Sequence, residues 1–152
     1  KNASEELWLV SYEEAVKKDC QDELIFFNFA SVCYSMGDKE KAMSLLRKGL
    51  EINPESEQIL MFQANTHAEN GEKEKAAVLY KQVIGLNRKY FDAYPPLAKI
   101  LVERKELKEA RTLLKSCLTM QPGFKAAYAG LADSYRESDP EVAKKYDSLA
   151  KE

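Results

Sequence analysis

A short charged phrase ending in alanine recurs three times along this chain at a constant interval of 34 residues. The three alanines are Ala42, Ala76 and Ala110. A fixed period of about 20–50 residues is typical of chains built from stacked copies of one supersecondary unit. The interval constrains the fold more than any other feature, because every copy must then contain the same elements in the same phase.

Each alanine phrase is preceded by a second apolar pattern. Its members are spaced i, i+3, i+4, i+7, which is the period of one helix face. We therefore expect each copy to consist of a first helix (helix A), a short turn and a second helix (helix B). The four helix A sets are Phe26, Phe29, Ala30, Cys33; Leu60, Gln63, Ala64, His67; Tyr94, Leu97, Ala98, Leu101; and Tyr128, Leu131, Ala132, Tyr135.

The recurring small residues and helix breakers have separate physical roles. Small pairs such as Ala30 and Ala42 let helices A and B approach closely. Gly37 and Gly71 permit the left-handed backbone conformation that ends helix A. Pro54 cannot extend a helix and is expected to end helix B, as is Pro122.

On these alanines, glycines and prolines the chain resembles the tetratricopeptide repeat family. The resemblance implies an all-α fold, an α-solenoid of antiparallel helix hairpins wound into a right-handed superhelix. Two positions depart from the pattern, since Arg88 replaces a terminating proline and Lys105 a turn glycine. The last repeat is one residue short. We expect a helix like half a repeat at 1–21, followed by four repeats at 22–55, 56–89, 90–123 and 124–152.

Composition and charge exclude several function classes. The formal net charge is −2, whereas binding to nucleic acid without sequence preference needs a basic excess. No apolar stretch approaches the roughly 20 residues of a membrane-spanning helix, so we expect no membrane insertion. We predict no nucleic-acid partner and no cofactor.

Candidate catalytic and metal-binding residues are sparse. His67 is the single histidine, and it lies in the core stripe of its helix A. Cys20, Cys33 and Cys117 are widely spaced and odd in number, which fits neither a disulfide framework nor a zinc motif. No known catalytic motif occurs. We predict no metal site and no enzyme activity, and the cysteines favour a reducing, cytoplasmic compartment.

The face of helix A opposite the core stripe is the expected partner-binding surface, because it lines the concave side of stacked hairpins. The predicted binding residues are apolar and aromatic in the first repeats and polar or mixed later. A second interpretation stays open, in which Phe27 and Met61 pack between neighbouring A helices instead. The predicted residues are Leu24, Phe27, Ser31, Tyr34, Met61, Asn65, Lys99 and Val102.

Some members of the resembled family clamp the C-terminal carboxylate of heat-shock chaperones with lysine, arginine and asparagine on this face. The matching positions here carry neither a basic residue nor an asparagine, so we do not expect such a clamp. Those positions are Phe27, Ser31, Phe62, Asp92 and Pro96.

The N-terminal segment carries apolar residues on two sides, which suggests an absent neighbour. Leu7, Trp8 and Val10 are the candidates for self-association into a homodimer. The favoured function is a scaffold that binds a protein or peptide segment in the concave groove. Two alternatives remain, a structural module and a regulatory segment of a larger protein or enzyme. Because residue 1 is Lys, we expect a processed or excised chain whose targeting signal has been removed.

Overall fold

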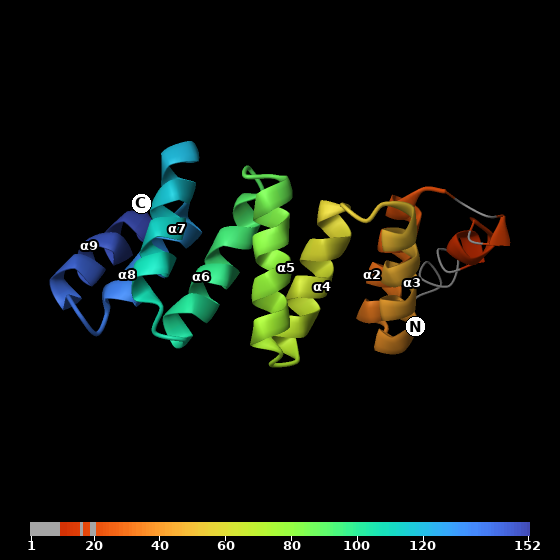
Figure 1. Cartoon of the computed structure of the whole chain (residues 1–152), viewed down its shortest axis with the longest axis horizontal. Coiled ribbons are helices and arrows are strands. Elements are labelled where there is room, and N and C mark those ends of the chain that lie inside the picture. The colour runs from red at the N-terminus through yellow and green to blue at the C-terminus, as the bar shows by residue number, and fades with distance from the viewer. Residues whose placement is uncertain (1–9, 16, 19–20) are drawn as a thin grey trace. The chain divides into compact units, whose positions relative to one another are not determined.

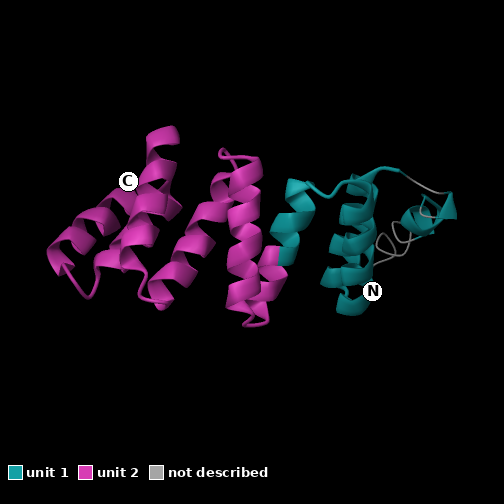
Figure 2. Ribbon diagram, viewed as in Figure 1, with its two compact units in different colours: residues 1–63 teal, residues 64–152 magenta. Residues whose placement is uncertain are grey.

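The structure is a computed structural model, and it describes residues 10–15, 17–18 and 21–152. All regular elements in these ranges are helices. The chain divides into two compact units, residues 1–63 and 64–152, and the division falls inside one helix (Figure 2). The helices are α2 (Glu23–Ser35), α3 (Lys39–Ile52), α4 (Glu57–Glu69), α5 (Lys73–Leu86), the 3₁₀ turn η1 (Phe91–Ala93), α6 (Tyr94–Glu103), α7 (Leu107–Met120), α8 (Lys125–Tyr135) and α9 (Pro140–Lys151).

Consecutive helices form hairpins. In the first unit α2 packs against α3, and in the second unit α6 packs against α7 and α8 against α9 (Figure 1). The pairs α2–α3, α4–α5, α6–α7 and α8–α9 each fall within one of the residue ranges predicted as repeats. The all-α solenoid class predicted from the sequence is therefore confirmed.

The turns between helices A and B follow one design in three of the hairpins. Each holds one residue in the left-handed region, at Gly37 (φ 88°), Gly71 (φ 79°) and Lys105 (φ 62°). The backbone N–H of the residue after it donates to the carbonyl oxygen five residues earlier in the chain, at 2.9, 2.9 and 2.8 Å in the three turns. This is the hydrogen bond of a Schellman motif, which satisfies a carbonyl at the helix end. The lysine therefore adopts the conformation that the glycines adopt, although a side chain disfavours it.

The fourth turn is built differently, which accounts for the repeat that is one residue short. The Asp139 amide donates to the Tyr135 carbonyl at 2.7 Å, so the loop closes one residue earlier. No residue of this turn has a positive φ among the described residues. The Asp139 carboxylate then accepts from the Val142 amide at 3.1 Å and caps α9.

The hairpins are held together by fully buried alanines. Ala30 of α2 and Ala42 of α3 both belong to the α2–α3 core, and neither residue is exposed. Ala98 and Ala110 are equally buried in α6 and α7. Larger apolar residues fill the space around these contacts, and the largest that are completely enclosed include Tyr80, Tyr94, Leu46, Ile59, Leu97, Leu101, Leu114 and Leu131.

The final helix α9 covers the end of the second unit with one side only. Ala143 is buried, and Tyr146 stacks on Tyr128 and Tyr135 with ring centroids 6.3 and 5.9 Å apart. The opposite side carries exposed charged and polar residues such as Lys144. A polar outer surface of this kind is what a terminal repeat needs to remain soluble.

We expect Lys105→Gly to raise the free energy of unfolding by roughly 0.5–1 kcal/mol, because glycine removes the cost of a left-handed conformation. Its lost ion pair with Glu137 is exposed and contributes little. Urea unfolding followed by circular dichroism measures the change.

Two control variants separate strain from side-chain loss. Lys105→Ala, which keeps the left-handed strain, should leave the free energy of unfolding nearly unchanged. Lys108→Gly, at an exposed helical position of α7, should instead lower the free energy of unfolding by roughly 0.5–1 kcal/mol. A Lys105→Gly protein no more stable than the parent would show that the left-handed conformation of Lys105 costs no stability.

Two helical glycines should respond in opposite ways to alanine. A Cβ at Gly49 would lie 2.4 Å from Ile59 Cδ1, so Gly49→Ala overpacks the α3–α4 contact and should cost roughly 1–3 kcal/mol. A Cβ at Gly85 meets nothing within 4 Å, so Gly85→Ala should stabilise α5 by roughly 0.5–1 kcal/mol. Thermal melts of the two variants test this. Equal changes of Tm with the same sign in both variants would show that the close approach of Ile59 to Gly49 does not limit stability.

Candidate partner-binding surfaces

The predicted binding residues of the first unit are largely engaged in packing. Phe27 and Tyr34 both meet the ring of Phe62 edge to face, at centroid separations of 6.0 and 5.3 Å. Met61 is only 9% exposed. Leu24, by contrast, is 42% exposed on α2. At Phe27 the structure therefore shows the packing between A helices that the sequence left open as the alternative. Met61 is buried, and Tyr34 makes the same kind of contact as Phe27.

The polar residues predicted for this face also have internal roles. The Ser31 hydroxyl donates to the carbonyl of Phe27 at 3.0 Å. The Asn65 amide oxygen accepts from the Tyr80 hydroxyl at 2.7 Å. Tyr80 is buried, and burial raises its phenol pKa to about 12. Since an unpaired buried hydroxyl is costly, Asn65 supports the α4–α5 hairpin.

In the second unit a groove opens between α6 and α8. It has a volume of about 470 Å³, within the roughly 300–1,000 Å³ typical of ligand sites. Of the predicted binding residues, Lys99 and Val102 both line it. Its remaining surface comes from residues that are mostly small, namely Pro95, Pro96, Glu103, Ala126, Ala129, Gly130 and Asp133.

The groove forms because small residues stand where the earlier repeats have large side chains. One position of the repeat carries Phe27, Met61, Pro95 and Ala129 in succession. The two large residues fill the space in the first unit. The proline and the alanine leave it open between α6 and α8.

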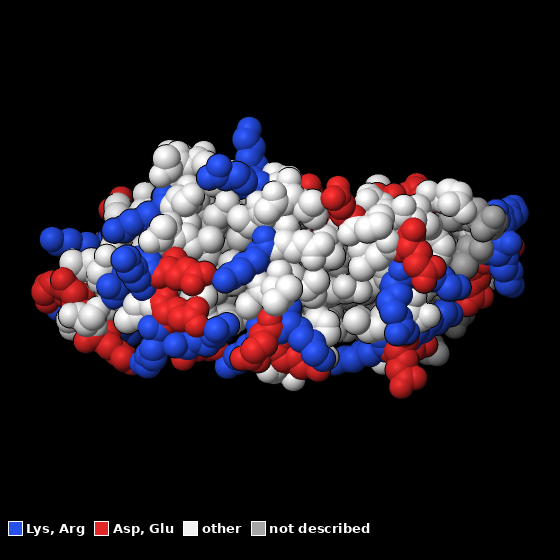
Figure 3. All heavy atoms as spheres, viewed as in Figure 1, with Lys and Arg blue, Asp and Glu red and all other residues white. Residues whose placement is uncertain are grey.

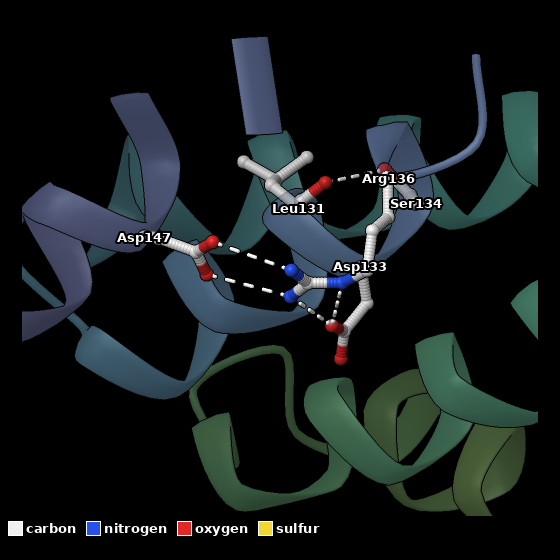
Figure 4. A network of polar contacts seen from close by, with 5 residues as sticks. All are labelled: Leu131, Asp133, Ser134, Arg136 and Asp147. Carbon is white, nitrogen blue, oxygen red and sulfur yellow. Dashed lines mark hydrogen bonds and ion pairs between the residues drawn. The ribbon is translucent and has the colours of Figure 1, made fainter. Parts of the chain in front are cut away.

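Both carboxylates in the groove already have cationic partners. Glu103 pairs with Lys73 of α5 at 2.8 Å, and the hydrogen bond to Glu103 raises the pKa of Lys73. Asp133 pairs with Arg136 at 2.7 Å, and Arg136 reaches on to Asp147 of α9 at 3.4 Å (Figure 4). The hydrogen bond to Asp133, followed by that to Asp147, raises the pKa of the guanidinium.

Lys99 differs from these groups. It is exposed and makes neither an ion pair nor a side-chain hydrogen bond with any residue that the structure describes. Elsewhere on the surface Lys, Arg, Asp and Glu are intermixed, as the face in Figure 3 shows. An uncompensated cation beside an apolar groove is therefore a local feature.

A larger depression of about 740 Å³ lies over α7. It is lined by that helix and the turn before it, and its charges alternate in sign at Lys105, Glu106, Lys108 and Glu109. Leu107 and Leu113 supply its apolar surface and are themselves half-buried. A single helix forms this surface, whereas the α6–α8 groove has two walls.

The comparisons with known proteins agree with this architecture. The sequence profile of the tetratricopeptide repeat matches residues 25–56 and 57–90. These residues are tetratricopeptide repeats. No curated protein sequence matches the chain significantly.

Solved structures show the same fold at low sequence identity. A crystal structure of MamA superposes with a TM-score of 0.78 at 22% identity, covering 93% of this chain and 84% of MamA. PilW, a type IV pilus biogenesis factor, gives 0.75 at 18% identity, covering 99% and 78%. A mutant O-GlcNAc transferase from Thermobaculum terrenum gives 0.71 at 21% identity, covering 85% of this chain and 26% of the transferase.

Stacked tetratricopeptide repeats are scaffolds for protein interaction, because their helices present extended surfaces instead of a closed active site. Within the described ranges no group of three or more metal-ligating side chains gathers. No helix there is long and apolar enough to cross a membrane. His67 contacts the Glu72 carboxylate, and this contact, second to one from Lys75, lowers the pKa of Glu72.

The candidates for self-association lie mainly outside the described residues. Leu7 and Trp8 belong to that part of the chain. Val10 is described and is 54% exposed. Nearby, Tyr12 stacks on Phe29 with centroids 5.5 Å apart, so one side of this segment faces the α2–α3 core. Self-association through Leu7, Trp8 and Val10 stays a prediction.

The two described cysteines should resist alkylation in the folded protein. Burial raises the pKa of the Cys117 thiol to about 11 and also raises that of Cys33. At pH 8 a thiol of pKa 11 is ionised in about one molecule in a thousand, and the thiolate is the reactive form. Mass spectrometry after iodoacetamide treatment should find both sites labelled in urea but not in buffer. Rapid labelling of Cys117 in buffer would contradict its burial.

Proposed function

We propose that this chain is a non-catalytic scaffold that binds a segment of a partner protein against the A helices of its tetratricopeptide repeats. The observation that carries this proposal is the groove between α6 and α8, which is open to solvent, apolar at its base and lined by Lys99 and Val102. Leu24 extends the candidate surface within the first unit, where it is exposed beside packed aromatic rings.

The second unit offers the better-supported candidate surface for this proposal. Phe27, Tyr34 and Met61 bury much of their surface against neighbouring helices, so a partner gains less by contacting them. Between α6 and α8 the backbones carry small side chains instead, and a partner residue can take the place that a large side chain fills elsewhere. Burying apolar surface there would contribute about 25 cal/mol per Å² to binding.

Two alternatives remain from the sequence. Exposed Val10 fits self-association of the N-terminal segment. The likeness to about a quarter of an O-GlcNAc transferase fits a regulatory segment of a larger enzyme. Neither alternative requires the α6–α8 groove. Filling that groove therefore separates the main proposal from both.

The test fills the groove without changing charge. Ala126 and Ala129 are exposed on α8 and line the groove, and methionine is a good helix former. The Ala126→Met, Ala129→Met protein should lose at least tenfold in affinity for a partner captured from host lysate by the parent. Titration with the purified partner measures the loss.

The matched control adds two methionines elsewhere. Thr119 and Ser148 are exposed on α7 and α9 and do not line the groove. The Thr119→Met, Ser148→Met protein should bind as the parent does. A partner that binds all three proteins equally would place the interaction on another surface. Mass measurement in solution of the parent and of Val10→Glu tests the self-association alternative in parallel.

A further inference from the structure

We propose that the α6–α8 groove binds an extended peptide segment, and that this segment places one aspartate or glutamate side chain against Lys99 and apolar side chains between the two helices. The proposal rests on the proposed function, because it specifies the chemistry of the segment that the same groove accepts. Four features of the described residues lead to it.

The first feature is the position that Lys99 occupies in the repeat. Asn65 and Ser31 stand at the equivalent position one and two repeats earlier, and Asp133 one repeat later. Each of these three side chains has a partner within the protein. Lys99 alone among the four has none in the described part of the chain. Its ammonium group is available to a ligand.

The second feature is the charge balance around the groove. Glu103 is paired with Lys73 and Asp133 with Arg136, so a cationic ligand would have to displace an existing ion pair. An anionic ligand meets Lys99 without such a cost. Arg136 is shared by two carboxylates, Asp133 and Asp147 (Figure 4).

The third feature is the start of α6, which cannot itself bind an anion well. A helix N-terminus attracts anions through free backbone N–H groups. Pro95 and Pro96 occupy the first turn of α6 and have no N–H. The Tyr94 amide is already bonded to the Phe91 carbonyl. Lys99 is thus left as the group that fixes where a carboxylate binds.

The fourth feature is the size of the groove. The groove has a volume of about 470 Å³ and is open to solvent, so it takes a few side chains of a segment that lies across it. An extended segment is narrower than a helix and can insert alternate side chains between the two walls. Ala129 and Gly130 on α8 face the prolines of α6 across this space, so apolar side chains of the segment can occupy the room that these residues leave.

The experiment is a selection from a phage library of random nine-residue peptides, carried out with the full chain and with Lys99→Glu. The matched control is Lys115→Glu, which changes an exposed lysine of α7 that makes no ion pair with the described residues and does not line the groove. We expect the parent and the control to select one acidic position flanked by apolar residues. Lys99→Glu should select lysine or arginine at that position.

Synthetic peptides then measure the contact. Replacing the selected acid by its amide, or Lys99 by Gln, should each weaken binding roughly two- to fivefold, the range for an exposed ion pair. Combining both changes should weaken it no further, as expected for one shared interaction. Raising the salt concentration should reduce the difference.

Three results would overturn the proposal, and they separate it from the proposed function. Selected peptides that lose binding on filling the groove but carry no acidic position would leave the groove function standing and refute the acid. Acidic peptides selected equally by the parent and Lys99→Glu would place the acid on another cation. Recovery of no peptide that depends on the groove would refute both the acid and the groove.

Discussion

The left-handed turn between helices A and B is the constraint on which the first three hairpins depend. It reverses the chain in three residues and closes with a hydrogen bond onto the end of helix A, so the alanines of the two helices are brought face to face. Gly37 and Gly71 adopt this conformation readily, whereas Lys105 adopts it against its preference. That the same bond forms at all three positions shows that packing between α6 and α7 outweighs the local cost at Lys105.

The sequence predicted this part of the fold because it depends on residues whose roles are local. An alanine at a helix crossing and a glycine in a turn act through their own backbone and Cβ, and both repeat at a visible interval. The fourth turn could also be anticipated, since the missing residue between Ala110 and Ala143 is countable. Gly49 was overlooked, although a glycine in the middle of a helix signals close approach. Ile59 lies where a Cβ on Gly49 would be.

The binding surface was harder to predict from sequence. Helical periodicity identifies the residues opposite the core stripe, but it does not say how near the next hairpin lies. For large residues such as Phe27 and Met61 the sequence therefore leaves two roles open, contact with a partner and packing inside the protein, and in the structure Phe27 packs on Phe62 while Met61 is buried. Asn65 has a role that only the fold reveals, because its partner Tyr80 belongs to the following helix.

What the sequence does contain is a gradient in side-chain size. Reading one position through the repeats gives phenylalanine, methionine, proline and alanine, and the neighbouring position gives asparagine, phenylalanine, proline and glycine. Within the second unit the small members of both series leave a space between α6 and α8 that no internal side chain fills. Small residues contribute less burial, so this space lowers the stability available from packing α6 against α8. Selection for stability alone would favour larger side chains there. The retained space, and Lys99 beside it with no ion pair among the described residues, support the proposal of a surface shaped for a partner segment.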